Sequence, residues 1–133
     1  MIRLFARLAP VLAVAGLLSA SCQKQVEAPY DKGVCWHLVF LQGGKMKFNE
    51  LAKNRSSLES CAAALEGMRL NFLKLGSHET DIIGAYQGNF LFLDRYGVFT
   101  SQTLTGARYP ALVRTGDGRL AIPGSVVQDP APQ

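Results

Sequence analysis

Apolar residues recur at alternating steps of three and four along one stretch in the middle of the chain: Leu58, Cys61, Leu65, Met68, Phe72 and Leu75. This spacing predicts an amphipathic helix over about 56–75 with a single buried stripe. Ser56 with Glu59 three positions later fits a capping box at the start. Gly76 directly follows the stripe and fits the glycine that ends a helix.

The segment before this helix has the pattern of a β-hairpin. Residues 34–41 form a short run rich in β-branched and aromatic side chains, which predicts a strand. The sequence Gln-Gly-Gly at 42–44 is a turn signal, and residues 45–48 alternate between polar and apolar as a returning strand does.

The segment after the helix begins with an apolar run. Residues 82–93 predict one long strand that contains two glycines, Gly84 and Gly88. Glycine inside a strand often marks a bulge or the close approach of another backbone. Alternation along a single strand would place Tyr86, Phe90 and Phe92 on one face.

Two hairpins complete the predicted sheet. Residues 94–97 form a turn after which 98–104 return, and an Asp-Gly turn at 115–118 joins 111–114 to 119–122. Strands joined by tight turns are antiparallel neighbours. The predicted fold class is therefore α+β, with one helix packed on an antiparallel sheet of about five or six strands.

The first 21 residues have the layout of a bacterial export signal. Arg3 and Arg7 form a positive start, residues 8–18 are apolar, and small residues lead to Cys22. The apolar part is too short for a comfortable membrane span. A small-x-small pattern for ordinary secretory cleavage and a lipoprotein-type cut predict the same bond, before Cys22.

A short leader that ends in small residues and a cysteine resembles that of bacterial lipoproteins. This resemblance covers the leader alone, and it departs from the family pattern because Ser19 stands where leucine is usual. It implies that Cys22 is lipidated, and that Gln23 after it directs the protein to the outer membrane on the periplasmic side. The alternative address is the soluble periplasm.

The remaining organisation follows from length and composition. A chain of 133 residues, 48% hydrophobic and 18% charged, is typical of one globular domain. We expect a flexible tether at 22–33, a single domain at 34–124 and a disordered tail at 125–133, where Pro130 and Pro132 lie.

Charge excludes one class of partner. The whole chain has 14 basic and 10 acidic residues; without the two leader arginines the balance falls to 12 against 10, a net charge of +2. That charge is too small to favour nucleic acid. The one basic cluster consists of Lys45, Lys47, Lys53 and Arg55. It is typical of a solvated sheet edge, where lysines discourage edge pairing, and an anionic partner is the alternative.

Cysteine parity predicts a disulfide. Of three cysteines, lipidation of Cys22 leaves Cys35 and Cys61 as a pair in an oxidising compartment. Their bridge would join the first strand to the start of the helix. It would close a loop of about 27 residues, worth roughly 3–4 kcal/mol in the chain-entropy model.

A metal site is the alternative use of these cysteines. Cys35 and His37 share a face of the first strand, and Cys61 would approach them if that face met the helix. Met68 or His78 could complete a set of soft ligands suited to copper or zinc. The chain has neither a paired C-x-x-C nor a C-x-x-C-H motif for haem, so we predict no cofactor.

The opposite face of the first strand carries Trp36, Leu38 and Phe40. A second predicted aromatic face carries Tyr86, Phe90 and Phe92. If the cysteine face meets the helix, these side chains need another cover. The favoured answer is internal: a curled sheet or a second layer. The alternative is an exposed patch that docks a partner, since aromatic clusters are common interface anchors.

Function follows only in outline from these features. No Gly-x-Ser-x-Gly, P-loop or His-Glu-x-x-His motif is present, which favours a binding protein over an enzyme, with a carboxylate pair assembled in three dimensions left open. The leading hypothesis is an accessory subunit of an envelope complex that binds a protein partner through the aromatic face. The alternative is a periplasmic module for a small ligand or metal, centred on Cys35, His37 and Cys61.

Overall fold

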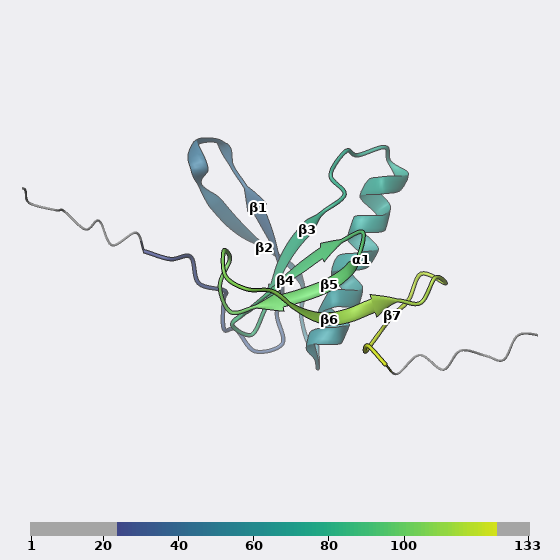
Figure 1. The fold of residues 1–133 in the computed structure, drawn as a ribbon. Helices are drawn as coiled ribbons and strands as arrows, with labels where there is room; N and C mark the ends of the chain where they lie inside the picture. Colours follow the sequence, from purple (N-terminus) through teal and green to yellow (C-terminus); the bar gives the residue numbers. More distant parts are fainter. Residues whose placement is uncertain (1–23, 125–133) are drawn as a thin grey trace, which may run out of the picture.

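The computed structural model describes residues 24–124 and shows one helix lying across one face of a seven-stranded antiparallel sheet (Figure 1). The elements are β1 (Cys35–Phe40), the short 3-10 turn η1 (Gln42–Gly44), β2 (Met46–Ala52), α1 (Leu58–Lys74), β3 (Ile82–Tyr86), β4 (Asn89–Asp94), β5 (Gly97–Ser101), β6 (Tyr109–Arg114) and β7 (Leu120–Ala121). The predicted α+β class is confirmed.

The strands are ordered β2-β1-β3-β4-β5-β6-β7 across the sheet. All neighbours but one pair follow each other in sequence, so short turns join them. The exception is the pair β1 and β3, because β2 and then α1 lie between them in sequence. The chain leaves β2 on one side of β1, and α1 carries it to β3 on the other side. Because α1 must pass over β1, it covers one face of the sheet (Figure 1).

The prediction of a single long strand over 82–93 is wrong. Two strands occupy it, with a turn at Gln87 and Gly88, whose φ angles of 43° and 83° are both positive. Two positive φ angles in a two-residue loop match the twist of a hairpin. Both flanking strands are buried on both faces, so the apolar run continues through the turn and hides it. The sheet therefore has one more strand than the predicted upper bound.

The C-terminal end of the helix agrees with the prediction, and the N-terminal end differs from it by one residue. Its N-cap is Ser57, whose side chain accepts a hydrogen bond from the backbone N–H of Ser60, so the predicted capping box of Ser56 with Glu59 is wrong by one residue. At the other end Gly76 has φ 78° and its N–H donates to the carbonyl of Leu73. This is the arrangement of a Schellman stop, as predicted.

Each face of the sheet has its own apolar cluster. The cluster under α1 contains these buried residues: Cys35, Cys61, Ala62, Leu65, Ile82, Tyr86, Leu91, Leu93, Val98 and Leu112. The cluster on the opposite face contains Ala28, Leu38, Ala85, Phe90 and Phe92. A sheet buried on both faces explains why β3 and β4 are apolar without alternation.

The predicted helix stripe is correct at its centre and wrong at its end. Cys61 and Leu65 are fully buried, whereas Leu75 is exposed beyond the last turn. Two charged residues instead extend the buried face, Glu66 and Arg69. Each follows a residue of the apolar stripe by one position. Glu66 meets Arg114 of β6, and Arg69 bonds to the carbonyl of Thr80 before β3.

The N-terminal segment meets the domain earlier than the predicted tether allows. Ala28 is buried in the second cluster, and the carbonyl of Pro29 accepts a hydrogen bond of 2.8 Å from the N–H of Gly88. The N–H of Gly33 donates to the side chain of Gln87 at 2.9 Å. Residues 28–33 are thus attached to the β3–β4 turn. The leader, Cys22 and the predicted tail lie outside the described residues.

Two glycines provide a matched test of this packing. A Cβ atom on Gly84 would overlap the side chain of Leu65 and approach the carbonyl oxygen of Trp36 to 2.7 Å, whereas one on Gly67 would meet nothing within 4 Å. We expect Gly84→Ala to lower the free energy of unfolding by about 1–3 kcal/mol through overpacking. Gly67→Ala should raise it by about 0.5–1 kcal/mol, because alanine favours a helix interior.

The comparison is made by urea denaturation of both variants beside the unmodified protein. Equal effects of the two substitutions would contradict the close contact between α1 and β3.

Candidate functional site

A disulfide joins Cys35 on β1 to Cys61 on α1, as the cysteine parity predicted. The two Cα atoms lie 5.3 Å apart, within the usual range for a bridge. Both residues are fully buried under the helix. The cysteine face of β1 is therefore the face that meets α1, which the sequence had left open.

His37 lies two residues along β1 from this bridge, and its ring is 6.5 Å from that of Phe72 on the helix. Burial lowers the pKa of His37 below its usual value of 6.5, while the Glu79 carboxylate acts in the opposite direction. The imidazole is therefore neutral at neutral pH.

The cluster of Cys35, His37 and Cys61 does not favour a metal. In the oxidised protein neither sulfur is a thiolate, and thiolates are the form that binds metal. Between residues 24 and 124, no group of three His, Cys, Asp or Glu side chains is placed to hold an ion. His37 and Glu79 both line one hollow, and His37 is the only side chain in its lining with a nitrogen that can bind a metal.

The aromatic face is mostly an internal core. Phe90 and Phe92 on β4 are buried, and so is Leu38 on β1. Two residues from outside the strands help to cover this cluster. Val26 comes from the segment before β1, and Leu104 comes from the loop between β5 and β6. The ring of Phe48 on β2 lies 6.4 Å from that of Phe90 on β4, although β1 and β3 lie between these two strands. The sheet therefore curls strongly around this face.

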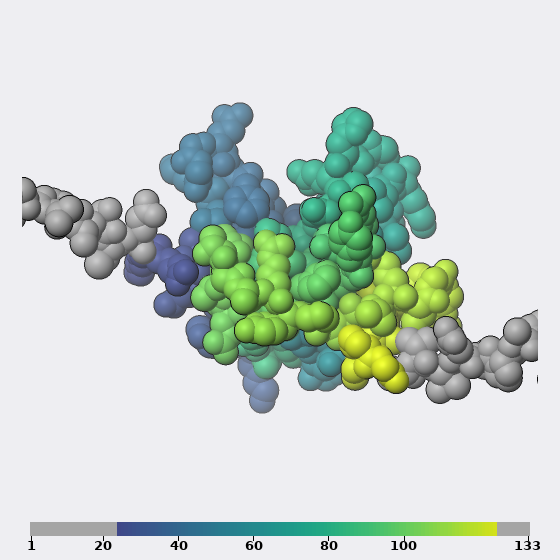
Figure 2. Space-filling model, in the orientation of Figure 1, coloured from purple at the N-terminus to yellow at the C-terminus, as the bar shows by residue number. Residues whose placement is uncertain are grey.

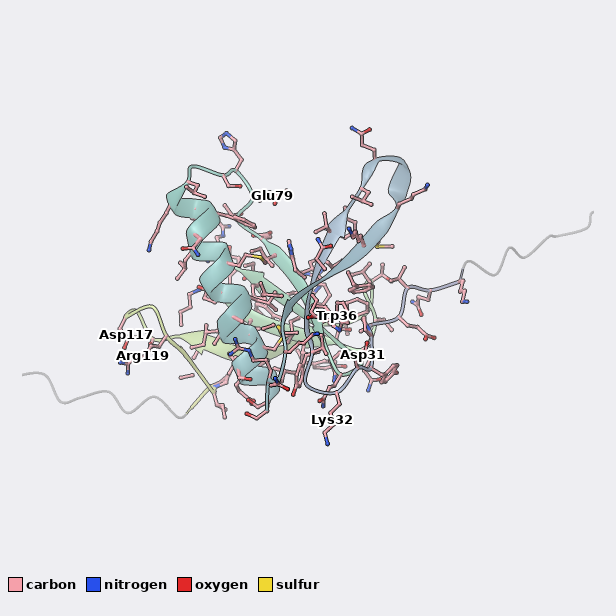
Figure 3. All side chains as sticks on the ribbon, turned by 180° about the vertical axis from the view of Figure 1, so that it is seen from behind. Asp31, Lys32, Trp36, Glu79, Asp117 and Arg119 are labelled. Carbon is pink, nitrogen blue, oxygen red and sulfur yellow. A yellow bond between two sulfur atoms is a disulfide. The ribbon has the colours of Figure 1, made fainter. Side chains whose placement is uncertain are left out.

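Arg108 closes the same face from the loop before β6. Its guanidinium carbon lies 3.7 Å from the centre of the Phe92 ring, a cation–π contact. Trp36 is half-buried in the body of the sheet, and its indole N–H is enclosed without a hydrogen-bond partner among the described residues (Figure 3).

Tyr86 does not belong to this face. It lies in the cluster under the helix, and its hydroxyl donates a hydrogen bond of 2.7 Å to the carbonyl of Arg55. The missed turn at Gln87 and Gly88 explains the error. Two turn residues between Tyr86 and Asn89 make those two direct cross-strand partners, so the alternation does not continue from β3 into β4.

One end of the predicted aromatic face stays open, on a projecting arm. β1 pairs with β3 only as far as Leu38, yet it pairs with β2 through to Phe40. The end of this hairpin therefore leaves the body of the sheet (Figure 1). At its tip Phe40 is 58% exposed and Leu41 is 46% exposed. We call residues 39–46 the arm.

The arm forms one wall of a cleft. A hollow of about 320 Å³ lies between β1 and the loop that leads into β3, with His37, Phe40, Glu79 and Asp81 in its lining. Figure 2 shows the notch between the arm, in blue, and the segment after α1, in teal. Beyond Leu38, no strand of the described chain pairs with the side of β1 that faces this cleft.

The basic cluster proposed from sequence is only partly assembled at this edge. Lys45 and Lys47 are exposed on the arm and on β2, which is the edge strand of the sheet. Lys53 instead pairs with Glu50 at 3.4 Å. This distribution is that of a solvated edge protected by lysines.

A buried ionic network joins the helix to β6, and no pattern in the sequence indicated it directly. Glu66 accepts two hydrogen bonds from Arg114, of 2.7 and 2.9 Å, and lies 3.6 Å from Arg69. Arg69 also donates to the carbonyl of Thr80. The bond to Glu66 raises the pKa of Arg114. The only available signal was the position of Glu66 and Arg69 beside the apolar stripe.

The sequence analysis left open a carboxylate pair assembled in three dimensions. Two acidic residues, Asp94 and Asp117, instead stabilise turns through hydrogen bonds. Asp94 accepts the backbone N–H groups of Tyr96 and Gly97 at 2.7 and 3.2 Å. Asp117 accepts a hydrogen bond from the Thr115 hydroxyl, which lowers the pKa of its carboxyl. Figure 3 places Asp117 on a loop remote from Glu79, so these two acids do not form a carboxylate pair.

Comparison with protein-family models, with curated proteins and with solved structures found no match. Within residues 24–124, α1 is neither long nor apolar enough to cross a membrane.

Proposed function

We propose that this chain is a small exported protein of the bacterial envelope that binds a protein partner, as an accessory subunit of an envelope complex. Lipid on Cys22 anchors it to the outer membrane, facing the periplasm. The leader and its cysteine support the anchor. The disulfide supports an oxidising compartment.

The observation that carries the binding role is the arm. Most of the predicted aromatic face is buried, so the partner cannot use Phe90 or Phe92. Phe40 and Leu41 stand at the tip of a hairpin that has left the sheet, next to a cleft. Adjacent exposed apolar side chains on a projecting element are typical of a protein docking site, and an aromatic residue there can act as its anchor.

Site-specific photocrosslinking tests this role. A photoreactive benzoylphenylalanine in place of Phe40, in the full-length protein in intact envelopes, should give one discrete adduct. The control position is Tyr96 on the β4–β5 turn, another exposed aromatic residue away from the arm. The adduct should weaken strongly when Leu41→Asp is added, because a charge at the tip opposes apolar docking. Identical adducts from positions 40 and 96 would contradict the arm as the docking site.

The address has its own test, the intact mass of the protein from native bacterial membranes. We expect a diacylglyceryl group on Cys22 and a gain of two hydrogens on reduction, from the single disulfide. A mature chain without lipid would contradict the anchor, and the arm could still bind its partner from the soluble periplasm.

A further inference from the structure

Two adjoining hollows lie along the loop that joins β5 to β6, and the first of them is also lined by the N-terminal segment. Their volumes are about 340 and 380 Å³. Asn89, Gln102 and Thr103 line both, so the hollows form one continuous groove. In Figure 2 the N-terminal segment, in purple, lies beside the β5–β6 loop, in green. We call this the polar groove.

The chemistry of the polar groove is neutral and rich in hydrogen-bonding groups. Side-chain amides and hydroxyls line it: Gln25, Gln87, Asn89, Thr100, Ser101, Gln102 and Thr103. Glu27 is the one acidic side chain in the lining, and the lining contains no lysine, arginine or histidine. Such a lining has no cation to recognise a phosphate or carboxylate, and too few apolar groups for a lipid tail or an aliphatic peptide anchor.

Some of these groups already make hydrogen bonds within the protein, and others are free to bind a ligand. Thr100 donates to the carbonyl of Phe90, and Ser101 accepts from the N–H of Thr103. The amides of Gln25 and Gln102 make no hydrogen bond to protein within residues 24–124. An amide offers both donors and an acceptor, which is the pairing that sugar hydroxyls require.

Tyr30 is an exposed aromatic ring held in a fixed place at one end of the groove. A Cβ atom on Gly88 would overlap this ring, so the ring lies directly against the glycine of the β3–β4 turn. The backbone beside it is pinned by the bond between Pro29 and Gly88. Even so, Tyr30 is 77% exposed. The ring therefore touches the turn, and most of its surface stays open to a ligand.

Tyr109 borders the other end of the groove and is 64% exposed. It is the first residue of β6, which pairs with Thr100 on β5, so its backbone is fixed by the sheet. Aromatic rings at both ends of a row of amides present apolar platforms with polar groups between them. Because these parts are held by the fold, little ordering cost remains for binding.

We propose that the polar groove binds a neutral oligosaccharide. Sugar rings carry apolar C–H faces and polar edges, so one ring stacks on Tyr30 while its hydroxyls meet the amides of Asn89 and Gln102. The groove is formed by the N-terminal segment, β4 and the β5–β6 loop, and the arm contributes no residue to it. This inference therefore stands whether or not the arm docks a protein.

The test is an NMR titration of the whole exported protein, purified with its disulfide formed. The two probes are chitotetraose, whose sugars are N-acetylated, and cellotetraose, whose sugars are not. We expect saturable shifts of side-chain amide resonances at Gln102 and Asn89 with at least one probe. Preference for chitotetraose assigns an N-acetylated glycan such as those of cell walls, and preference for cellotetraose assigns an unacetylated one.

Matched variants locate the site. Tyr30→Ala should weaken binding about fivefold to tenfold through loss of the stacked ring. Tyr96→Ala removes a similarly exposed tyrosine from the β4–β5 turn and should leave binding within twofold. Unchanged melting temperatures show that both variants are folded. Absence of saturable shifts with both probes, or equal weakening by the two variants, would overturn the proposal.

Discussion

Replacing both Cys35 and Cys61 by alanine is expected to lower the free energy of unfolding by about 3–4 kcal/mol. The bridge spans a sequence separation of 26 residues and ties β1, the strand next to the β2 edge of the sheet, to the start of α1. In the chain-entropy account, its loss releases a loop of that length in the unfolded state. That is a large share of the stability of a small domain.

Urea denaturation of the oxidised protein and of the double variant measures this loss. Adding a reductant to the unmodified protein should reproduce it, because reduction opens the same loop. Cys22→Ser is the matched control: it replaces the third cysteine, with the lipid proposed on its sulfur, and leaves the bridge intact, so the free energy of unfolding should not change. A loss below about 1 kcal/mol in the double variant would show that the helix holds its place on the sheet without the covalent link.

Glu66→Ala is expected to lower the free energy of unfolding by about 3–5 kcal/mol. The Glu66 side chain is 5% exposed and faces two arginines, Arg69 at 8% and Arg114 at 24%. Removing the carboxylate leaves both arginines with little water and without their closest counter-charge, although Arg114 still feels a second carboxylate, Asp94. The effect should exceed that of deleting an apolar group of similar size, because the penalty comes from the partners left behind.

Two further variants separate this cause from simple loss of packing. Glu50→Ala breaks a pair of the same charge type on the surface, where both side chains are largely exposed, and should cost less than about 1 kcal/mol. Replacing Glu66, Arg69 and Arg114 together by leucine should recover much of the stability, since no uncompensated charge remains. If the triple variant is less stable than Glu66→Ala, unpaired charge does not explain the loss in Glu66→Ala. The hydrogen bonds of the network would then contribute stability that leucine packing cannot replace.

Local signals predicted most of the secondary structure. The Asp-Gly turn at 117–118 and the turn at 94–97 are hairpins as expected, and Gly76 ends the helix. Each depends on the conformation of a few neighbouring residues, and side-chain type decides that conformation. The sequence analysis did not predict the turn at Gln87 and Gly88, because Gln-Gly is a weak turn signal between two buried strands.

The candidate sites were less predictable. Alternation along β1 correctly separated Cys35 from Trp36, but it could not show what covers each face. Tyr86 was assigned to the wrong face because a two-residue turn breaks the alternation on which the assignment rested. The polar groove combines residues from 25 to 109, and nothing in the local sequence of any one of them indicates the others.

The sequence by itself determined the helix, the hairpins other than the one at Gln87 and Gly88, the α+β class and the pairing of Cys35 with Cys61. Spacing and parity act over short distances or involve few partners. The tertiary structure decided which aromatic residues are buried, that Glu66 meets Arg114, and that Phe40 and Tyr30 stay exposed. Burial depends on the curl of the sheet and on segments that return from far along the chain. Those long-range contacts are set by the fold as a whole, so no local pattern carries them.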